Sequence, residues 1–257
     1  MGITITNGLI IFSNSFDAGY VQCVIESNGI VNGTCTQYSS IASLPAPRGL
    51  SSYNNIMYFT SMNSDSYLYT QCNMTILGVL NSSCAMFSSS DISISPVNTE
   101  DIAFDESHAY MSYYYNDAGL IQCNLVGGII DNNSCFTIPN SGNMNLDMPH
   151  GVTIYKNYIF IVNQQWTNGQ GYTQCNLNSN GIDVNSCTSV TNLSLFNQPI
   201  DMAIYNDIAY FTNSSGNYIT QCNMNSTGVD LSSCVIKTPT GIGALREPGF
   251  ISINPIQ

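Results

Sequence analysis

The sequence has few charged residues and very few cations. Only 8% of its 257 residues are charged, against about 25% in a typical soluble domain, and four Lys and Arg stand against sixteen Asp and Glu. The formal net charge is −12. A surface this poor in cations repels phosphate backbones and anionic lipid, so we predict no nucleic-acid partner. Asn, Ser, Thr and Tyr supply the polarity instead, which suits an exposed protein that hydrogen-bonds water, glycans or copies of itself.

Long hydrophobic runs are also missing. No apolar run approaches the roughly 18 residues that a membrane-spanning helix needs, so we expect no membrane insertion. The opening "MGITITNGLIIF" has no basic segment ahead of its apolar residues and is not predicted to be a signal peptide. No stretch shows the periodicity of an amphipathic helix. The chain is therefore expected to consist of strands and turns.

The ten cysteines, by contrast, form five pairs with one internal spacing. Each pair belongs to a segment such as "QCNMNSTGVDLSSC", and its two cysteines are twelve positions apart in every copy. The copies span 22–35, 71–84, 122–135, 174–187 and 221–234. A repeat that recurs about every 50 residues is typical of propeller blades.

Two apolar segments precede each cysteine pair. In the last repeat they read "DMAIY" (201–205) and "IAYFT" (208–212), and the cysteine segment with the residues after it supplies two more strands. We therefore predict a single all-β domain, a five-bladed β-propeller with four antiparallel strands per blade, lettered A to D from the axis outward. The expected blades are 1–46 closed by 247–257, 47–97, 98–147, 148–197 and 198–246.

Each cysteine pair is predicted to form a disulfide across the hairpin of strands C and D. A glycine lies midway between the cysteines in four copies, whereas the third copy has Gly127 and Gly128 slightly early. A symmetric hairpin places the two cysteines opposite each other, with Cα atoms about 4.5–5.5 Å apart and within disulfide range. The predicted disulfides are Cys23–Cys35, Cys72–Cys84, Cys123–Cys135, Cys175–Cys187 and Cys222–Cys234.

Zinc is the alternative role for these cysteines. It requires closely spaced Cys and His ligands, and no histidine lies near any pair, so disulfides are favoured and no metal or cofactor is predicted. Each disulfide closes a loop worth about 3 kcal/mol in the chain-entropy model. Such bonds persist in oxidising compartments, so we expect an extracellular or cell-surface location.

The repeat pattern resembles that of a known group of proteins. The pattern comprises "PID" at the start of an inner strand, "AYFT" in the next strand, "QCN", a glycine and "SC". It is similar to the repeats of bacterial propeller proteins related to the lactonase-like and NHL-type families. Some secreted members carry a cysteine pair around the last hairpin of the blade. The resemblance covers nearly the whole chain and implies an extracellular propeller, but no particular activity.

Both ends of the chain resemble an inner strand. "GITIT" (2–6) precedes "LIIF" as "DMAIY" precedes "IAYFT", and "PGFISIN" (248–254) matches "PIDMAIY" (199–205). The chain thus has six segments that resemble strand A but only five sets of strands B, C and D. Either the C-terminal strand closes the first blade, or the sequence is part of a longer array, or a terminal strand is donated to a neighbouring subunit. The candidate assembly residues are Pro248, Phe250, Ile251 and Ile253.

The loops between strands B and C form the face on which propellers usually bind ligands. Aromatic side chains for sugar stacking occur beside amides in two of these loops, although they could instead pack between blades. The candidate ligand-binding residues are Tyr113, Tyr114, Tyr115, Trp166 and Asn168. Aspartates recur in three loops and could bind calcium, but solvated turn residues are favoured. They are Asp17, Asp65 and Asp117.

Several residues recur near the axis or in strand C. Asp101 and Asp201 open two inner strands, where they could form a small polar or cation site or cap the strands. Arg48 and His150 occupy equivalent positions after a proline. A glutamine precedes the first cysteine of every repeat, and we favour a hydrogen bond to the neighbouring blade over a role in five equivalent binding sites. These residues are Gln22, Gln71, Gln122, Gln174 and Gln221.

We therefore interpret the chain as a secreted structural or adhesive propeller without catalysis. The first version is a filament or surface subunit that exchanges a terminal strand with a copy of itself. The alternative is a lectin-like propeller that binds a surface glycan; a glycosidase- or lactonase-type enzyme is less favoured because no catalytic set of carboxylates assembles from the motifs. Seven Asn-x-Ser/Thr triplets are candidate glycosylation sites, although an Asn- and Ser-rich chain also produces them by chance. They are Asn32, Asn73, Asn81, Asn132, Asn192, Asn213 and Asn225.

Overall fold

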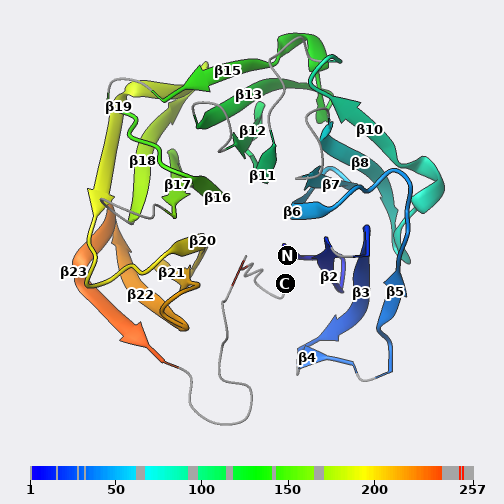
Figure 1. The fold of residues 1–257 in the computed structure, drawn as a ribbon, viewed down its shortest axis with the longest axis horizontal. Coiled ribbons are helices and arrows are strands. Elements are labelled where there is room, and N and C mark those ends of the chain that lie inside the picture. Colours follow the sequence, from blue (N-terminus) through cyan, green and yellow to red (C-terminus); the bar gives the residue numbers. More distant parts are fainter. Residues whose placement is uncertain are drawn as a thin grey trace.

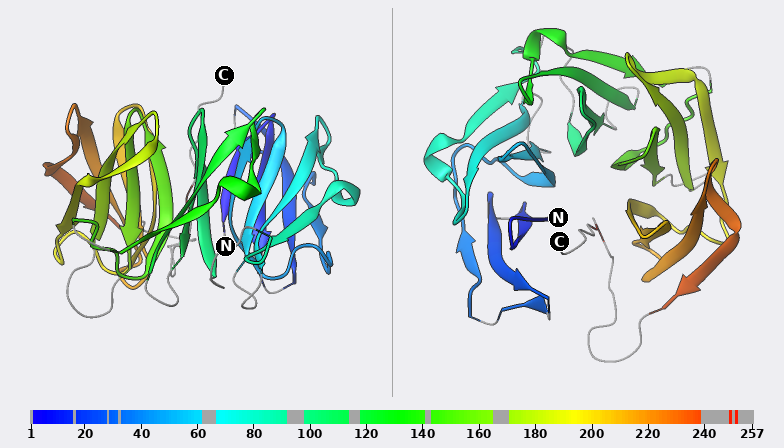
Figure 2. Two further views of the ribbon diagram at one scale, coloured as in Figure 1. Left: turned by 90° about the horizontal axis from the view of Figure 1, so that it is seen from above. Right: turned by 180° about the vertical axis from the view of Figure 1, so that it is seen from behind.

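The protein is a β-propeller of five blades, each an antiparallel sheet that follows the previous one around an axis (Figure 1, Figure 2). This computed structural model describes residues 2–15, 17–27, 29–31, 33–61, 67–91, 98–113, 118–140, 143–164, 171–238, 249 and 251. The predicted fold class is confirmed. Within these ranges, no helix is long and apolar enough to cross a membrane.

Each blade has four strand positions. Position A holds the inner strands β1 (Ile3–Thr6), β6 (Pro47–Tyr53), β11 (Thr99–Phe104), β16 (Pro149–Tyr155) and β20 (Pro199–Tyr205). Position B holds β2 (Leu9–Asn14), β7 (Ile56–Ser61), β12 (His108–Tyr113), β17 (Tyr158–Asn163) and β21 (Ile208–Asn213). Position C holds β3 (Gly19–Glu26), β8 (Tyr67–Thr75), β13 (Gly119–Val126), β18 (Gly171–Asn178) and β22 (Tyr218–Asn225).

The outer position D is continuous in two blades and divided in three. It is a single strand in β19 (Gly181–Thr191) and β23 (Gly228–Lys237). Elsewhere it consists of two short strands: β4 (Gly29–Ile30) with β5 (Thr36–Tyr38), β9 (Gly78–Val79) with β10 (Ala85–Ser88), and β14 (Ile129–Ile130) with β15 (Phe136–Pro139). In blades two and three a 3-10 turn separates the two, over Asn81–Ser83 and Asn132–Ser134.

Two-residue turns with left-handed backbone join strands A and B in blades one, two and five. Asn54 and Asn55 have φ of 48° and 59° in blade two, and Asn206 and Asp207 have 49° and 55° in blade five. Both central residues of a type I′ turn need positive φ, and Asn and Asp tolerate it better than most side chains. Short polar turns of this kind hold the A–B pairs of these three blades in register.

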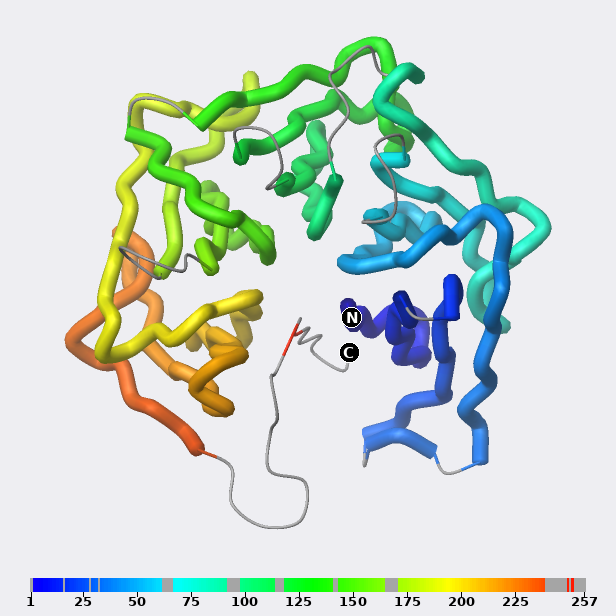
Figure 3. The backbone as a smooth tube through the Cα atoms, viewed as in Figure 1, coloured from blue at the N-terminus to red at the C-terminus, as the bar shows by residue number. Residues whose placement is uncertain are grey.

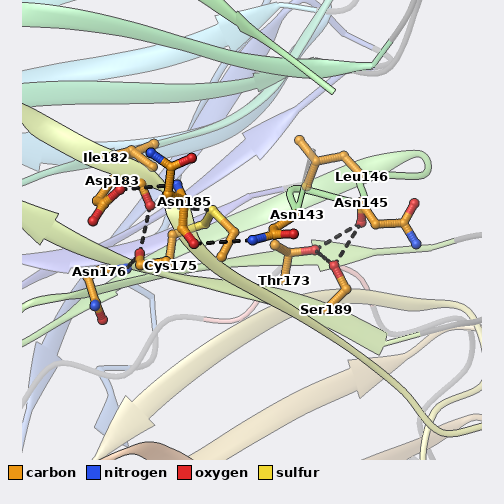
Figure 4. Close-up of a disulfide and its surroundings, with 12 residues drawn as sticks. Asn143, Asn145, Leu146, Thr173, Cys175, Asn176, Ile182, Asp183, Asn185 and Ser189 are labelled. Carbon is orange, nitrogen blue, oxygen red and sulfur yellow. Dashed lines mark hydrogen bonds between the residues drawn. A yellow bond between two sulfur atoms is a disulfide. The ribbon is translucent and has the colours of Figure 1, made fainter. Parts of the chain in front are cut away.

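All five predicted disulfides are confirmed. Each joins strand C to position D with a Cα–Cα distance of 4.1 Å. No free cysteine is found in the described part of the chain. Figure 4 shows the blade-four disulfide, with the incoming segment from blade three beside it: Asn143 Nδ2 donates to Asn185 O at 3.2 Å, and Thr173 Oγ1 donates to Asn145 O at 3.0 Å. The disulfide and its surroundings therefore also anchor the connection between blades.

One hydrophobic cluster fills each junction between successive blades, from one–two to four–five. Aromatic pairs cross these junctions: the ring centroids of Tyr20 and Phe59 are 5.7 Å apart, and those of Tyr172 and Phe211 are 5.4 Å apart. The disulfide of the following blade belongs to the cluster in all four cases. Among the described residues, no such cluster joins blade five to blade one.

The two ends of the chain occupy different inner positions. β1 pairs with β2 and is the inner strand of blade one. Gly249 and Ile251 instead bind blade five: Thr212 Oγ1 donates to Gly249 O at 2.6 Å, and Ile251 N donates to Asp201 Oδ2 at 2.8 Å. The closure of blade one by 247–257 stays a prediction, because within that range the structure describes Gly249 and Ile251 alone. The rest of that range, including Pro248, Phe250 and Ile253, lies outside the described residues.

Candidate functional site

The inner strands of all five blades line a cavity of about 280 Å³ on the axis. Hydrophobic side chains alternate there with a few polar ones, because successive residues of a strand point to opposite sides. The polar residues in the lining are Thr4, Ser51, Asp101, Thr153 and Asp201. The cavity thus contains hydroxyls and two carboxyl groups, and Ile251 contributes to its wall.

Asp101 and Asp201 hold neighbouring inner strands together. Val152 N donates to Asp101 Oδ2 at 2.9 Å, as Ile251 N does to Asp201, and Met202 N donates to Asp201 Oδ1 at 2.7 Å. An added Cβ on Gly151 would lie 2.0 Å from Asp201 Oδ1, so each aspartate leaves room only for glycine on the inner strand before it. These aspartates therefore bridge successive inner strands, a role that the sequence did not predict. No group of three or more His, Cys, Asp or Glu side chains within the described ranges is arranged to hold a metal ion.

Burial makes both aspartates weaker acids than usual. It raises the pKa of Asp101 to about 7 and raises the pKa of Asp201 well above its usual range, since a charged carboxylate loses solvation there. Backbone N–H donors lower both values, and the proximity of Asp101 to Asp201 raises that of Asp201 further. These two carboxyl groups therefore carry less negative charge near neutral pH than the sequence suggests.

A second polar group lies where three inner strands begin, and we call Arg48, Glu100, His150 and Gln164 the strand-start cluster. Glu100 is at its centre: its Oε2 is 2.9 Å from His150 Nδ1 and 3.8 Å from Arg48 Nε. His150 Nε2 lies 2.7 Å from Gln164 Oε1. Both ring nitrogens of His150 therefore lie within hydrogen-bonding distance of a side-chain oxygen.

The Glu100 side chain is completely buried, and its other oxygen is not used. Oε1 has no hydrogen-bond partner within the described structure, although a buried carboxylate oxygen without a donor is costly. Arg48 is partly exposed, with 26% of its side chain accessible. The cluster thus places a buried carboxylate oxygen that has no described hydrogen-bond partner beside a partly exposed guanidinium.

Sequence reasoning identified Arg48 and His150 as equivalent positions but missed Glu100. The signal was present, because Glu100 precedes Asp101 as Arg48 precedes Gly49 and His150 precedes Gly151. The backbone carbonyl of each accepts a hydrogen bond from a hydroxyl of the preceding blade, as in the 2.8 Å bond from Thr60 Oγ1 to Glu100 O. Blade three lacks the proline that marked the other strand starts, which hid the alignment.

The candidate ligand-binding aromatics are only partly within the described residues. Tyr113 is 4% exposed and packs in the cluster between blades two and three, so it offers no free stacking face, contrary to prediction. Tyr114, Tyr115, Trp166 and Asn168 lie outside the described residues.

Two further groups of predicted residues are placed less fully. Among the loop aspartates, Asp17 accepts from Asn14 Nδ2 at 2.8 Å and from Gln37 Nε2 at 3.0 Å, as a turn residue does. Asp65 and Asp117 are not among the described residues. Of the glycosylation candidates, Asn213 is fully buried and cannot carry a glycan in the folded protein, which corrects that prediction.

Three of the repeated glutamines bind the next blade, as favoured. Gln22 Nε2 donates to Leu77 O at 2.7 Å, and its Oε1 accepts from Val79 N at 3.2 Å. Gln122 and Gln174 donate in the same way to the hairpins of blades four and five. Gln71 Oε1 has no hydrogen-bond partner among the described residues, and the blade-three hairpin that it faces has its glycines, Gly127 and Gly128, earlier than in the other blades.

Solved structures share this architecture at low identity. The PQQ-bound aldose sugar dehydrogenase from Streptomyces coelicolor matches with a TM-score of 0.63 and 10% identity, over 98% of this chain and 84% of that one. The calcium-binding protein regucalcin from Agrobacterium tumefaciens gives 0.62 and 8%, over 99% and 78%. A provisionally assigned 6-phosphogluconolactonase from Bacteroides fragilis gives 0.61 and 10%, over 96% and 71%.

These matches confirm the fold-level resemblance to lactonase-like propellers. They also correct the prediction that the protein is not an enzyme, because structures named as a lactonase and a sugar dehydrogenase have the same architecture. At about 10% identity the likeness establishes the fold and assigns no reaction. No family model matches the sequence. No curated protein matches it either.

Proposed function

We propose that this protein is a secreted propeller that binds a neutral, hydroxyl-rich ligand of the glycan class at the strand-start cluster. The observation that supports this is the buried Glu100 carboxylate, whose Oε1 lacks a donor beside the partly exposed Arg48. A sugar hydroxyl can donate to the carboxylate while it accepts from the guanidinium. An anionic ligand would meet a chain of net charge −12 and is disfavoured.

The position of the cluster agrees with this proposal. Its members open the inner strands, on the same face as the B–C loops, and Gln164 follows directly after β17. The next residues in that loop read "QWTNGQ", and the corresponding loop of blade three begins "YYND" after Tyr113. Aromatic rings and amides of this kind bind the faces and hydroxyls of sugars. The five disulfides suit the oxidising, extracellular environment in which glycans are displayed.

The test is a binding titration of the unreduced protein against a panel of neutral mono- and oligosaccharides. We expect Glu100→Gln to weaken binding by about 10- to 100-fold, the effect of losing a hydrogen bond to a charged group. Glu26→Gln is the matched control, since Glu26 is exposed on β3. Equal affinity in both variants, with E100Q folded by circular dichroism, would contradict the proposal. Product analysis of the same samples shows whether a bound sugar is also turned over.

A second candidate function, self-assembly into a filament or surface layer, is favoured by the position of the C-terminal segment. Gly249 and Ile251 bind blade five as the inner strand of a following blade would, while β1 fills the inner position of blade one. The same contacts from a neighbouring copy would link subunits head to tail by strand addition. Sedimentation of the unreduced protein across a concentration series tests this candidate.

A further inference from the structure

Every occupied junction in this propeller is built from the same two faces. We call the side of a blade that packs against the next blade along the chain its leading face, and the opposite side its trailing face. The leading face presents the third residue of strand B, which is 0% exposed in blades one to four: Ile11, Tyr58, Tyr110 and Phe160. The trailing face of the next blade presents the fourth residue of its strand B together with its disulfide, and these belong to the same hydrophobic cluster.

The leading face of blade five lacks this cover. Tyr210, its third residue in strand B, is partly exposed, and so is Ile219, although the equivalent residues of the other blades are buried. Tyr205 is 36% exposed, whereas its equivalent Tyr53 stacks on Phe104 of the next blade at 5.1 Å. Gln221 has no hydrogen-bond partner within the described structure, unlike Gln22, Gln122 and Gln174.

The trailing face of blade one is open in the corresponding way. Phe12, the fourth residue of its strand B, is partly exposed, whereas Phe59, Met111, Ile161 and Phe211 are buried. Cys35 is exposed, although the second cysteine of every other blade is buried or half-buried. Figure 3 shows β23 and the strands β3 and β4 on either side of an interval that no other described strand occupies.

We infer that these two faces hold one further blade-type β-sheet, formed by polypeptide outside residues 1–257. The two open faces present the same kinds of residue as the faces at the four junctions between blades. A sheet that fits between them should therefore be built like a blade. A single inner strand would not suffice, because Tyr210 and Ile219 lie on the middle strands of blade five. A second copy of this chain docked through its own blade one would place its blades two to five where this ring already stands.

The faces specify the chemistry of this partner. Its trailing side needs an apolar residue that packs against Tyr210. It also needs a hairpin with a glycine turn whose backbone forms hydrogen bonds with the Gln221 side chain, as the hairpin at Gly78 does with Gln22. Lys237 occupies the outer-strand position of Tyr38, Phe87 and Ile138, so the partner is expected to place an acceptor there. The inference concerns the same junction as the assembly candidate but requires a different partner, and it is independent of the sugar site.

The test attaches a probe blade and then releases it. Residues 206–238, the outer strands of blade five, are fused after residue 257 through a protease-cleavable linker, with a scrambled segment of equal composition as control. Attachment raises the effective concentration of the probe to the millimolar range, so that a competent face is occupied. We expect the probe to slow reductive alkylation of Cys35 at least tenfold, to leave Cys187 unaffected, and to remain bound on gel filtration after the linker is cut.

Two results would overturn the inference. One is a folded probe that leaves Cys35 as reactive as in the parent and separates after cleavage. The other is a parent chain that forms a dimer in which Cys35 is already protected, since a second copy would then be the occupant. Gln221→Ala provides the specific control. It should be silent in the parent, where Gln221 has no hydrogen-bond partner among the described residues, and it should weaken retention of the probe. Sugar binding by the same samples shows separately whether the strand-start site is functional.

Discussion

At the residue scale, the axis of this propeller is organised by alternation between aspartate and glycine. Asp101 and Asp201 reach across to the backbone of the next inner strand, and Gly49 and Gly151 make room for them. A carboxyl group in this position is desolvated, so the protein retains protons there that an unfolded chain would release.

This organisation predicts how stability depends on pH. The folded pKa of Asp101, about 7, exceeds its ordinary value of 3.8, so the folded state binds more protons between these pH values. The free energy of unfolding should therefore fall as pH rises from about 4 to 7, by at most about 1.4 kcal/mol per pH unit for one group. Urea denaturation at several pH values measures it. Asp101→Asn should flatten the slope and Asp17→Asn, an exposed control, should not; equal slopes in all three proteins would refute the assignment.

At the scale of the element, the C–D hairpin with its disulfide is a unit that forms locally and then packs against its neighbour. The disulfides have the same spacing and the same Cα–Cα distance in every blade. Their surroundings differ, since four are packed against a preceding blade and the first is not. Cys35 is exposed, whereas Cys187 is 4% exposed.

The order in which the disulfides are reduced should follow this difference. Under limiting dithiothreitol we expect Cys23–Cys35 to open first and Cys175–Cys187 last, because the attacking thiolate must reach a sulfur atom. Alkylation followed by peptide mass spectrometry identifies the pairs. Loss of the first disulfide should cost about 3 kcal/mol of unfolding free energy in the chain-entropy model. Opening of Cys175–Cys187 ahead of Cys23–Cys35 would show that access does not control the reaction.

At the scale of the whole molecule, the question is what occupies the junction between blades five and one. Four junctions share one construction, and Gly249 and Ile251 supply only the inner strand at the fifth. Two hypotheses differ in what fills this junction. In the strand-exchange hypothesis it is the terminal segment of a second copy, and in the added-blade hypothesis it is a separate sheet.

Deletion of residues 248–257 separates these hypotheses. If terminal-strand exchange drives assembly, polymers of the intact chain seen by negative-stain microscopy should disappear on deletion, because the main-chain contacts to Thr212 and Asp201 are lost. Sedimentation velocity quantifies the loss. Asp207→Asn, at an exposed turn of the same blade, should leave the polymers intact. Polymers that persist after deletion would assign assembly to another surface.

The sequence by itself determined the number of blades, the strand order and all five disulfides. These features depend on contacts within one repeat, where a spacing of twelve residues and a glycine turn leave few alternatives. The sequence also predicted that Gln22, Gln122 and Gln174 bind the next blade. A residue at the same position of every repeat faces the same part of the neighbouring blade each time.

Only the tertiary structure decided which residues of different repeats meet. It placed Glu100 between Arg48 and His150, buried Tyr113 in a junction, and set Gly249 and Ile251 against blade five. Each of these contacts joins residues from different blades, whose distance in space depends on how the sheets stack around the axis. The local pattern of a repeat is the same whether the ring closes or stays open, so only the exposure of the two end faces distinguishes the outcomes.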